Sequence, residues 1–303
     1  MRYRPFGRSG LALSTVGLHV AREKLHKNHN LMQKLIVTAL ENGINTYHFD
    51  SCDTKMLQAA AEVFSVVERK LLFVSIGAQE QSVDLDPAAY GLNALKERLR
   101  GAVKDSGLSW IDLLVFSEEG AAVLPEDSLA FVKSLQRSKM LRYIAAEAES
   151  LSMAAIINSG QFDVIKTSFD IDSSWDKRRQ IDNAIAREMN IMAAGFFPEA
   201  YRKASDNIPA DARRGWFGAK AKNPLAGAGT HAFLHQTSEW TPEELCLGYA
   251  LSQPSLACIF VEPDNAEHLE RLAAVPERHL PPSVPAQIEM ARFNDRDPKS
   301  ASR

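Results

Sequence analysis

Short apolar runs alternate with segments of helical periodicity along most of this 303-residue chain. Residues 71–77, LLFVSIG, illustrate the pattern, because they lie between a helical segment at 56–70 and another at 91–107. Each unit of strand and helix is close to the length that a parallel βαβ crossover needs. Several apolar runs show no polar alternation, which is typical of parallel strands that are buried on both faces. The repeat therefore predicts an α/β protein with a parallel sheet.

The number of repeats favours a closed barrel over an open sheet. About seven or eight units in a row fit a (β/α)8 TIM barrel, which typically needs ~250 residues. A doubly wound open sheet is the alternative, but no GxGxxG motif follows the first strand. The predicted strands are 44–50, 71–77, 110–117, 141–148, 162–169, 191–197 and 256–262, and the predicted helices are 30–43, 56–70, 91–107, 129–140, 151–160, 179–190 and 243–253.

The two ends of the chain depart from this repeat. Residues 2–18 alternate polar and apolar side chains around a GRSG turn, which predicts an N-terminal β-hairpin. From residue 281 on, PPSVP and NDRDPKSASR predict a short final element and a partly disordered tail. We therefore expect a single barrel domain over residues 1–280 and a tail over residues 281–303.

Composition excludes several classes of partner. The formal net charge is −3, so the chain has no overall positive field that would attract nucleic acid or an anionic membrane. No apolar run approaches the ~20 residues that a membrane span needs. The three cysteines, Cys52, Cys246 and Cys258, have no CxxC spacing and indicate reduced thiols. We expect a cytoplasmic protein that neither binds nucleic acid nor inserts into a membrane.

Five segments, taken in order, resemble the aldo-keto reductase family. They are MRYRPFGRSGLALSTVGL at 1–18, ENGINTYHFD at 41–50, WIDLLVF at 110–116, KMLRYIA at 139–145 and ALSQPSLACIFVEPDNAEHLERL at 250–272. The likeness extends over roughly residues 1–275. It implies a (β/α)8 barrel that reduces carbonyl compounds with NAD(P)H and without a metal, at the carboxyl ends of the strands.

The same resemblance implies that the catalytic tetrad of the family is degenerate here. In the family a Tyr donates a proton, a Lys lowers the pKa of that Tyr, an Asp pairs with the Lys, and a His orients the substrate. Asp50 is retained, but Lys55, Gly77 and Ser117 stand at the positions of the Tyr, the Lys and the His. We therefore assign no catalytic residue and expect Asp50 to be a structural carboxylate, neutralised either by Lys55 or by main-chain donors at the strand end. An active NAD(H)-dependent oxidoreductase that uses Lys55 or a lid residue as a rebuilt proton donor is the alternative.

The cofactor positions that the resemblance implies have also changed. Lys166 replaces a Gln at a strand end, Ala194 stands where the family has a stacking Tyr, and Gly195 and Phe196 replace the Ser and Pro that follow it. Asp264 replaces the Arg that binds the 2′-phosphate of NADPH, so NAD(H) is expected over NADP(H) if any dinucleotide binds. Asn265 is expected to cap the following helix and leave N–H groups for a phosphate. The cofactor-binding candidates are thus Asp50, Lys166, Gly195, Phe196, Asp264, Asn265 and Glu270.

A set of histidines with one cysteine and a long segment near residue 220 are two further features of the sequence. A zinc site built from His19, His26, His29 and Cys52 is not expected, because no pair has the helical HxxxH spacing. The segment 202–238, which carries Trp216 and Phe217, is interpreted either as a lid over the barrel mouth or as a docking surface with an aromatic anchor.

These observations together predict a non-catalytic, regulatory protein that binds NAD(H). The resemblance extends to oxidoreductase-like bacterial cell-cycle regulators, and it implies FtsZ and a cell-cycle sensor kinase as protein partners. A third possibility is a barrel that only scaffolds a complex.

Overall fold

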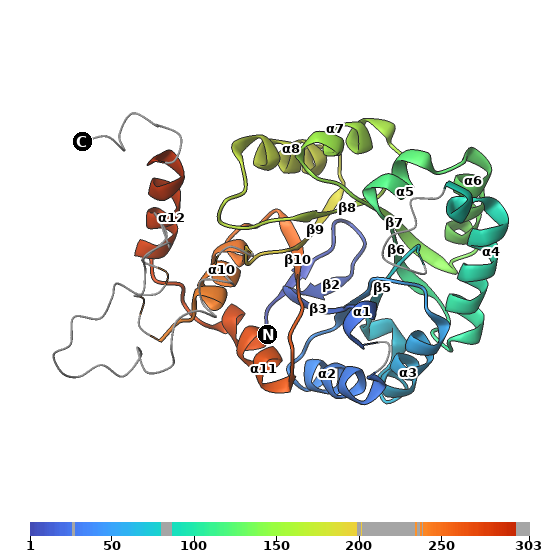
Figure 1. The fold of residues 1–303 in the computed structure, drawn as a ribbon, viewed down its shortest axis with the longest axis horizontal. Helices are drawn as coiled ribbons and strands as arrows, with labels where there is room; N and C mark the ends of the chain where they lie inside the picture. Colours follow the sequence, from blue (N-terminus) through green and yellow to red (C-terminus); the bar gives the residue numbers. More distant parts are fainter. Residues whose placement is uncertain are drawn as a thin grey trace.

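The computed structural model describes residues 1–25, 28–79, 87–198, 201, 234, 237 and 239–294. Eight parallel strands close into a barrel in the order β10-β3-β4-β5-β6-β7-β8-β9, which confirms the predicted (β/α)8 fold (Figure 1). The barrel strands are β3 (Val16–Val20), β4 (Thr46–Phe49), β5 (Phe73–Gly77), β6 (Ile111–Phe116), β7 (Leu141–Glu147), β8 (Val164–Ser168), β9 (Asn190–Ala194) and β10 (Leu256–Val261).

Helices surround the barrel and connect successive strands (Figure 1). They are α1 (Arg22–Leu25), α2 (His29–Glu41), α3 (Thr54–Phe64), α4 (Leu92–Arg100), α5 (Glu118–Val123), α6 (Glu126–Arg137), α7 (Ser150–Ser159), α8 (Trp175–Ala186), α10 (Pro242–Leu251), α11 (Ala266–Ala274) and α12 (Ser283–Asn294). The last helix, α12, lies beyond α10, in the segment expected to hold a short final element (Figure 1). The domain boundary at residue 280 stays a prediction, and residues 295–303 lie outside the described residues.

The predicted N-terminal hairpin is confirmed, but it ends earlier than the sequence suggested. Strands β1 (Tyr3–Pro5) and β2 (Ala12–Ser14) pair antiparallel, and the barrel begins at Val16. The alternation of residues 2–18 therefore merges two elements, because the first barrel strand follows the hairpin after one residue. Phe6 is fully buried and its ring lies 5.1 Å from those of Phe73 and Tyr143, so the hairpin closes the amino end of the barrel.

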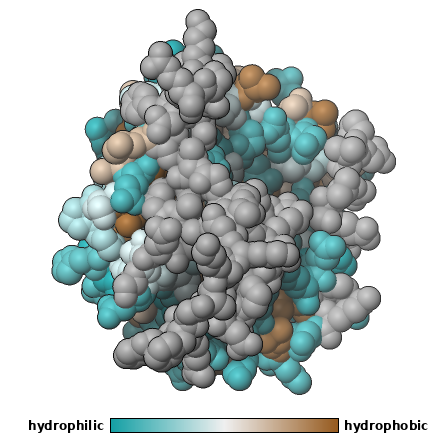
Figure 2. Space-filling model, turned by 60° about the vertical axis from the view of Figure 1, so that its left-hand side comes forward, coloured by the Kyte–Doolittle hydropathy of each residue, from teal (hydrophilic) through white to brown (hydrophobic). Residues whose placement is uncertain are grey.

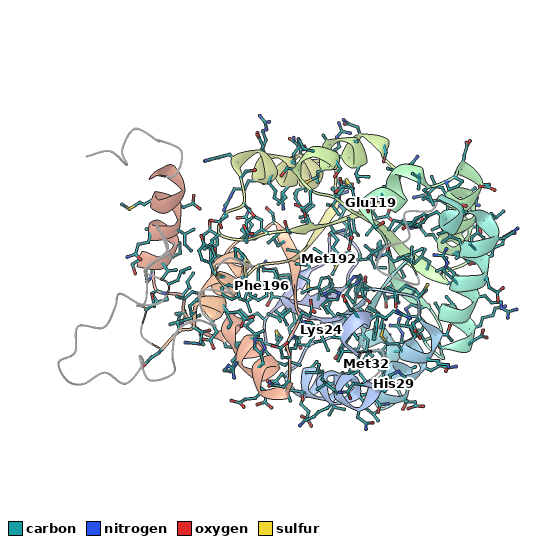
Figure 3. All side chains as sticks on the ribbon, in the orientation of Figure 1. Lys24, His29, Met32, Glu119, Met192 and Phe196 are labelled. Carbon is teal, nitrogen blue, oxygen red and sulfur yellow. The ribbon has the colours of Figure 1, made fainter. Side chains whose placement is uncertain are left out.

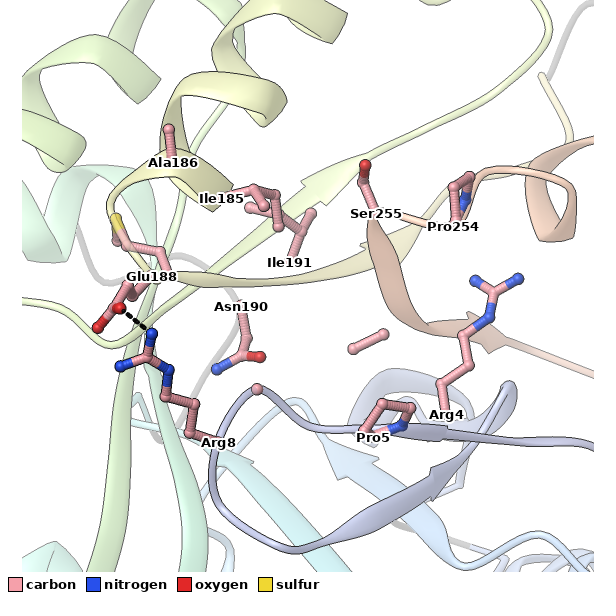
Figure 4. A pocket seen from close by; sticks show the side chains of 13 residues that line it. Arg4, Pro5, Arg8, Ile185, Ala186, Glu188, Asn190, Ile191, Pro254 and Ser255 are labelled. Atoms are coloured by element: carbon pink, nitrogen blue, oxygen red, sulfur yellow. Dashed lines mark ion pairs between the residues drawn. The ribbon is translucent and has the colours of Figure 1, made fainter.

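A pocket of about 800 Å³ remains between this hairpin and the amino ends of β9 and β10 (Figure 4). The Arg4 guanidinium lies on its edge and donates to the carbonyl oxygens of Leu251, Gln253 and Leu256. A cation is favourable at the carboxyl end of a helix, so Arg4 fastens the hairpin to the end of α10. The packing of the hairpin against the barrel and α10 therefore accounts for this pocket.

The barrel interior is apolar towards its amino end. One cluster of buried residues fills it, and Met192 lies near its centre (Figure 3). A second, larger cluster occupies the layer between the strands and the helices. Strands β4, β6 and β10 are buried along their whole length, as expected for parallel strands covered on both sides.

The outer surface contrasts with this interior. On the side shown in Figure 2 the described surface is mainly hydrophilic, with small hydrophobic areas. None of the helices in the described part of the chain is long and apolar enough to cross a bilayer.

A fully buried carboxylate ties three strands together at the amino end of the barrel. Asp112, on β6, accepts a hydrogen bond from the main-chain N–H of Val74 on β5 at 2.9 Å. It also forms ion pairs with Arg69 at 2.8 Å and Arg142 at 2.9 Å, and accepts from the Trp110 indole at 3.1 Å. Every oxygen of this carboxylate is therefore compensated, as a buried charge requires.

We predict that Asp112→Ala lowers the free energy of unfolding by about 3–5 kcal/mol, because it leaves two partly buried guanidinium groups without a carboxylate. Urea unfolding would measure this loss. The control is Asp176→Ala on α8, whose exposed side chain pairs only with Arg179 and whose removal should change stability by less than about 0.5 kcal/mol. Equal effects of the two substitutions would contradict the prediction.

Candidate functional site

Polar side chains gather where the barrel strands end. Parallel strands of a barrel end at one face, and that face is where the sites of such barrels are built. The contributing residues are Asp50 after β4, Gly77 at the end of β5, Ser117 after β6, Glu147 at the end of β7, Lys166 within β8 and Glu262 after β10.

Asp50 is held by the main chain, one of the two arrangements expected, and the alternative pair with Lys55 is not formed. The N–H of Arg22 donates to Oδ1 of Asp50 at 2.9 Å. Lys55 lies in the exposed first turn of α3, which Asp53 caps, and no ion pair joins it to Asp50 in the described part of the chain. Lys55 is instead part of the helix start: its N–H donates to the capping Asp53, and its side chain is exposed.

Burial raises the pKa of Asp50 from 3.8 to about 6. The Arg22 N–H and the Lys166 ammonium favour the ionised form and oppose this shift, whereas the negative charge of Glu262 adds to it. A carboxyl group with a pKa near neutrality exchanges protons readily at physiological pH. Asp50 is thus the titratable group of the barrel mouth, with Lys166 as its nearby ammonium.

Gly77 is confined by the neighbouring strand. A Cβ atom at this position would lie 2.2 Å from the carbonyl oxygen of Asp50 and 2.7 Å from its carbonyl carbon. No side chain fits at such distances unless the main chains of β4 and β5 separate. The residue at the position of the family's Lys is therefore a glycine for a packing reason.

Ser117 serves as a helix cap. Its hydroxyl oxygen accepts from the N–H of Gly120 at 3.0 Å and begins α5. The phenol oxygen of Tyr90 lies 3.1 Å from the Ser117 hydroxyl, a contact that the sequence did not suggest. Tyr90 is buried in the layer between strands and helices, so its phenol is a packed side chain of that layer.

Two histidines of the barrel strands pack together, which the sequence did not predict. His19 on β3 and His48 on β4 are register partners, with ring centroids 5.2 Å apart. Burial lowers the pKa of His19 to about 4 and that of His48 well below its usual value, so both rings are neutral at physiological pH. His48 shares a hydrogen bond of 2.9 Å with Ser75, while Nε2 of His19 is buried without a partner among the described residues. Strand alternation in VGLHV and TYHF was the available signal.

The zinc hypothesis finds no support in the described residues. No group of three metal-ligating side chains comes together there, and His26 lies outside them. His29 is the first residue of α2, and Cys52 is buried with its thiol 3.3 Å from the carbonyl oxygen of Gln79. Trp216 and Phe217, with most of the segment 202–238, also lie outside the described residues.

Two predicted cofactor positions meet in one pocket of about 380 Å³. Lys166 and Gly195 line it, together with Glu118, Glu119, Glu147, Ala148, Glu149, Thr167, Ser168 and Ala194. The Lys166 side chain is only 11% exposed, and its Nζ lies 2.6 Å from Oε1 of Glu147. Phe196 is buried and packs in the core, so the structure does not present its ring to this pocket.

The predicted adenosine positions meet at the start of α11. Asn265 caps this helix and accepts from the N–H of His268 at 2.9 Å, as predicted. Asp264 is 74% exposed and lies 3.8 Å from Nζ of Lys24, which pairs more closely with Glu262 at 2.8 Å. Glu270 is exposed on the same helix. The helix start is acidic, apart from Lys24.

We predict that Gly77→Ala lowers the free energy of unfolding by about 1–3 kcal/mol, the usual cost of forcing extra atoms into packed structure. The control is Gly91→Ala, because Gly91 has φ −65° and its nearest contact would be 3.2 Å. Urea unfolding of both variants measures the difference. A Gly77→Ala protein as stable as the control would show that the strands separate easily.

We predict that Asp50→Asn stabilises the protein at pH 7 by about 1–3 kcal/mol. The folded protein binds a proton at Asp50 at higher pH than the unfolded chain does, because the pKa is about 6 when folded and 3.8 otherwise. Stability from this group is therefore present below pH ~4 and lost as the pH rises through ~6. Unfolding at pH 4 and at pH 7 should show the two proteins diverging only at the higher pH; parallel profiles would contradict the assignment.

Comparison with known proteins supports the fold and goes no further. No family model matches the sequence, and no curated protein matches it either. Among solved structures, the chain is similar to the aldo-keto reductase AKR11C1 from Bacillus halodurans in its holo form, with a TM-score of 0.71 over 96% of each chain. The two sequences are 15% identical, so the similarity establishes that this chain has the fold of an aldo-keto reductase.

Proposed function

We propose that this protein is a catalytically degenerate aldo-keto reductase that binds NAD(H) and acts as a KidO-like regulator of protein partners. The observation that carries the proposal is the close approach of the Asp50 carbonyl oxygen to Gly77. A lysine in that place would have to part the two strands, and without it an unperturbed phenol with a pKa about 10 is a poor proton donor near neutrality. The family's carbonyl reduction therefore lacks its basis here.

The other two altered positions support the same proposal. Lys55 is exposed on α3 and forms no ion pair with Asp50 among the described residues, which argues against its ammonium as a proton donor. Ser117 is committed to capping α5. A helix cap at Ser117 and an exposed ammonium at Lys55 are what a site released from catalysis would contain.

Binding of a dinucleotide is supported by what remains of the mouth. A pocket of about 380 Å³ includes Lys166 and Gly195, and Asn265 opens a helix whose N–H groups suit a phosphate. Asp264 and Glu262 would repel a 2′-phosphate, whereas Asp264 suits a free ribose hydroxyl. The holo form named for the Bacillus halodurans enzyme is consistent with cofactor binding in this fold. We therefore propose NAD(H) over NADP(H).

The protein partners are proposed from the resemblance alone. They are FtsZ and a cell-cycle sensor kinase, as for the cell-cycle regulator KidO. A cytoplasmic location is part of the same proposal.

A second function has one observation in its favour. The barrel mouth contains a carboxyl group with a pKa of about 6 and an ammonium that acts on it, Asp50 and Lys166. Such a pair could serve general acid–base catalysis near neutral pH. An NAD(H)-dependent oxidoreductase with this rebuilt donor is therefore the alternative.

We predict that NADH binds with a dissociation constant below 1 mM and NADPH at least about tenfold more weakly, since one added repulsion of about 1.4 kcal/mol is a factor of ten. Titration followed by tryptophan fluorescence measures both. Asp264→Arg should raise the affinity for NADPH, and Glu267→Arg, a carboxylate one turn further along α11, is the control for a general charge effect.

Assays on one purified sample distinguish the regulatory function from the oxidoreductase. Turnover of NADH with a panel of aldehydes and quinones would support the oxidoreductase and overturn the non-catalytic proposal. Absence of binding of either dinucleotide at millimolar concentration would overturn both.

A further inference from the structure

We propose that the first turns of α5, α7 and α8 form a docking surface, here called the acidic rim, for a basic segment of a partner protein. A lysine or arginine of that segment would enter the pocket lined by Glu118 and Glu119, and an adjacent apolar side chain would pack on Leu151 and Trp175. This inference names the chemistry of the partner and rests on the proposed regulatory function.

Two large apolar side chains project from the acidic rim. Leu151, at the second position of α7, is 98% exposed, and Trp175, at the first position of α8, is 56% exposed. Neither side chain is fully packed in the core. Large apolar side chains are unusual in this setting, because the first turn of a helix usually holds polar residues. Exposed tryptophan is enriched among the residues that dominate binding energy at protein interfaces.

The two side chains belong to one surface, because their helix starts touch. Glu149 caps α7, and its Oε2 lies 2.5 Å from Nζ of Lys177 in the first turn of α8. Leu151 is two residues beyond Glu149, and Trp175 is two residues before Lys177. With a rise of about 1.5 Å per residue, both apolar side chains stay within one turn of this ion pair.

Hydrogen bonds tie the helix starts of the acidic rim to one another, which reduces the ordering that binding would require. The N–H and hydroxyl of Ser168 donate to Glu149 at 2.9 and 3.0 Å, which joins the end of β8 to the start of α7. The N–H of Glu149 donates to Glu118 at 3.3 Å, which joins α7 to α5. Lys177 is buried and donates to both Glu149 and Ser168.

The charge of the surface selects a cationic partner. Four glutamates and one lysine line the pocket, and that lysine, Lys166, pairs with Glu147. Lys177 pairs with Glu149, so Glu118 and Glu119 are left without an ion pair among the described residues. Figure 3 shows Glu119 on the same side of the barrel as α7 and α8. Two unneutralised carboxylates beside a partly enclosed pocket attract a side-chain cation.

The same charge argues against other occupants. An anionic membrane or a nucleic acid would be repelled by the unpaired glutamates. A second copy of this chain that docked through the same surface would place like charges together, which is unfavourable in an isologous contact. A basic segment with an apolar residue meets both the charge and the exposed apolar side chains.

The test uses three fluorescein-labelled peptides and the intact protein. One alternates lysine with leucine, the second replaces each lysine by glutamate, and the third replaces each leucine by serine. Fluorescence anisotropy should show binding of the first peptide only, weakening as salt is raised. Leu151→Ser with Trp175→Ala should weaken it at least about tenfold, and Glu118→Gln with Glu119→Gln should reduce both affinity and salt dependence.

A matched control is Val66→Ser, an 80% exposed apolar residue between α3 and β5, at the opposite end of the barrel. It should leave the affinity unchanged. The inference is overturned if the lysine–leucine peptide does not bind, if the glutamate peptide binds as well, or if Val66→Ser weakens binding as much as the rim variants.

Dinucleotide titration of the same samples separates this inference from the proposed function. Binding of NADH without binding of the peptide would overturn the docking surface alone. Binding of the peptide without NADH would overturn the sensing function and retain the docking surface.

Discussion

The close approach of two main chains at the mouth of the barrel limits what this site can contain. The parallel register of β4 and β5 pairs Phe49 with Ile76, and it brings the carbonyl group of Asp50 against the α-carbon of Gly77. Space that a side chain would occupy is filled by backbone. Because main chain cannot move aside as a flexible side chain can, a single substitution at position 77 cannot rebuild a lysine there. The constraint belongs to the local spacing of β4 and β5 in this chain, so a lysine at position 77 would require these two strands to lie further apart.

Several polar groups of the barrel mouth are neutral or paired. His19 and His48 are neutral because they are buried, and Lys166 is neutralised by Glu147. Burial disfavours the charged form of Asp50, so this carboxyl group keeps its proton to an unusually high pH. The mouth therefore holds groups with shifted pKa values, and Glu118 and Glu119 border it without an ion pair among the described residues. The phenol of Tyr90, which lies beside Ser117, is buried in the layer between strands and helices.

The sequence could predict the barrel because its signal is repeated. Eight strands with buried faces each repeat the same apolar pattern, so the loss of any one boundary, such as that between the hairpin and Val16, does not change the fold. The site depends on single contacts and was predicted less well. The cap at Asn265 was predicted because a local sequence pattern encodes it. The Asp50–Lys55 pair, one of the two arrangements expected, is not formed, and Tyr90 and His48 were missed because only the tertiary fold brings them to Ser117 and Ser75.

One pocket serves both ligands that we propose, and this has a thermodynamic consequence. Lys166 and Gly195, which stand at nicotinamide positions by resemblance, line the same space as Glu118 and Glu119 of the acidic rim. A dinucleotide and a basic segment that share this space must alter each other's affinity, and the change must be equal in both directions. The two ligands compete if the cationic side chain of the basic segment occupies the place of the nicotinamide ring. They cooperate if the positively charged ring of NAD⁺ and the basic segment contact different carboxylates of the pocket. The proposed regulator would in this way report the state of a bound dinucleotide to a protein partner without performing any reaction.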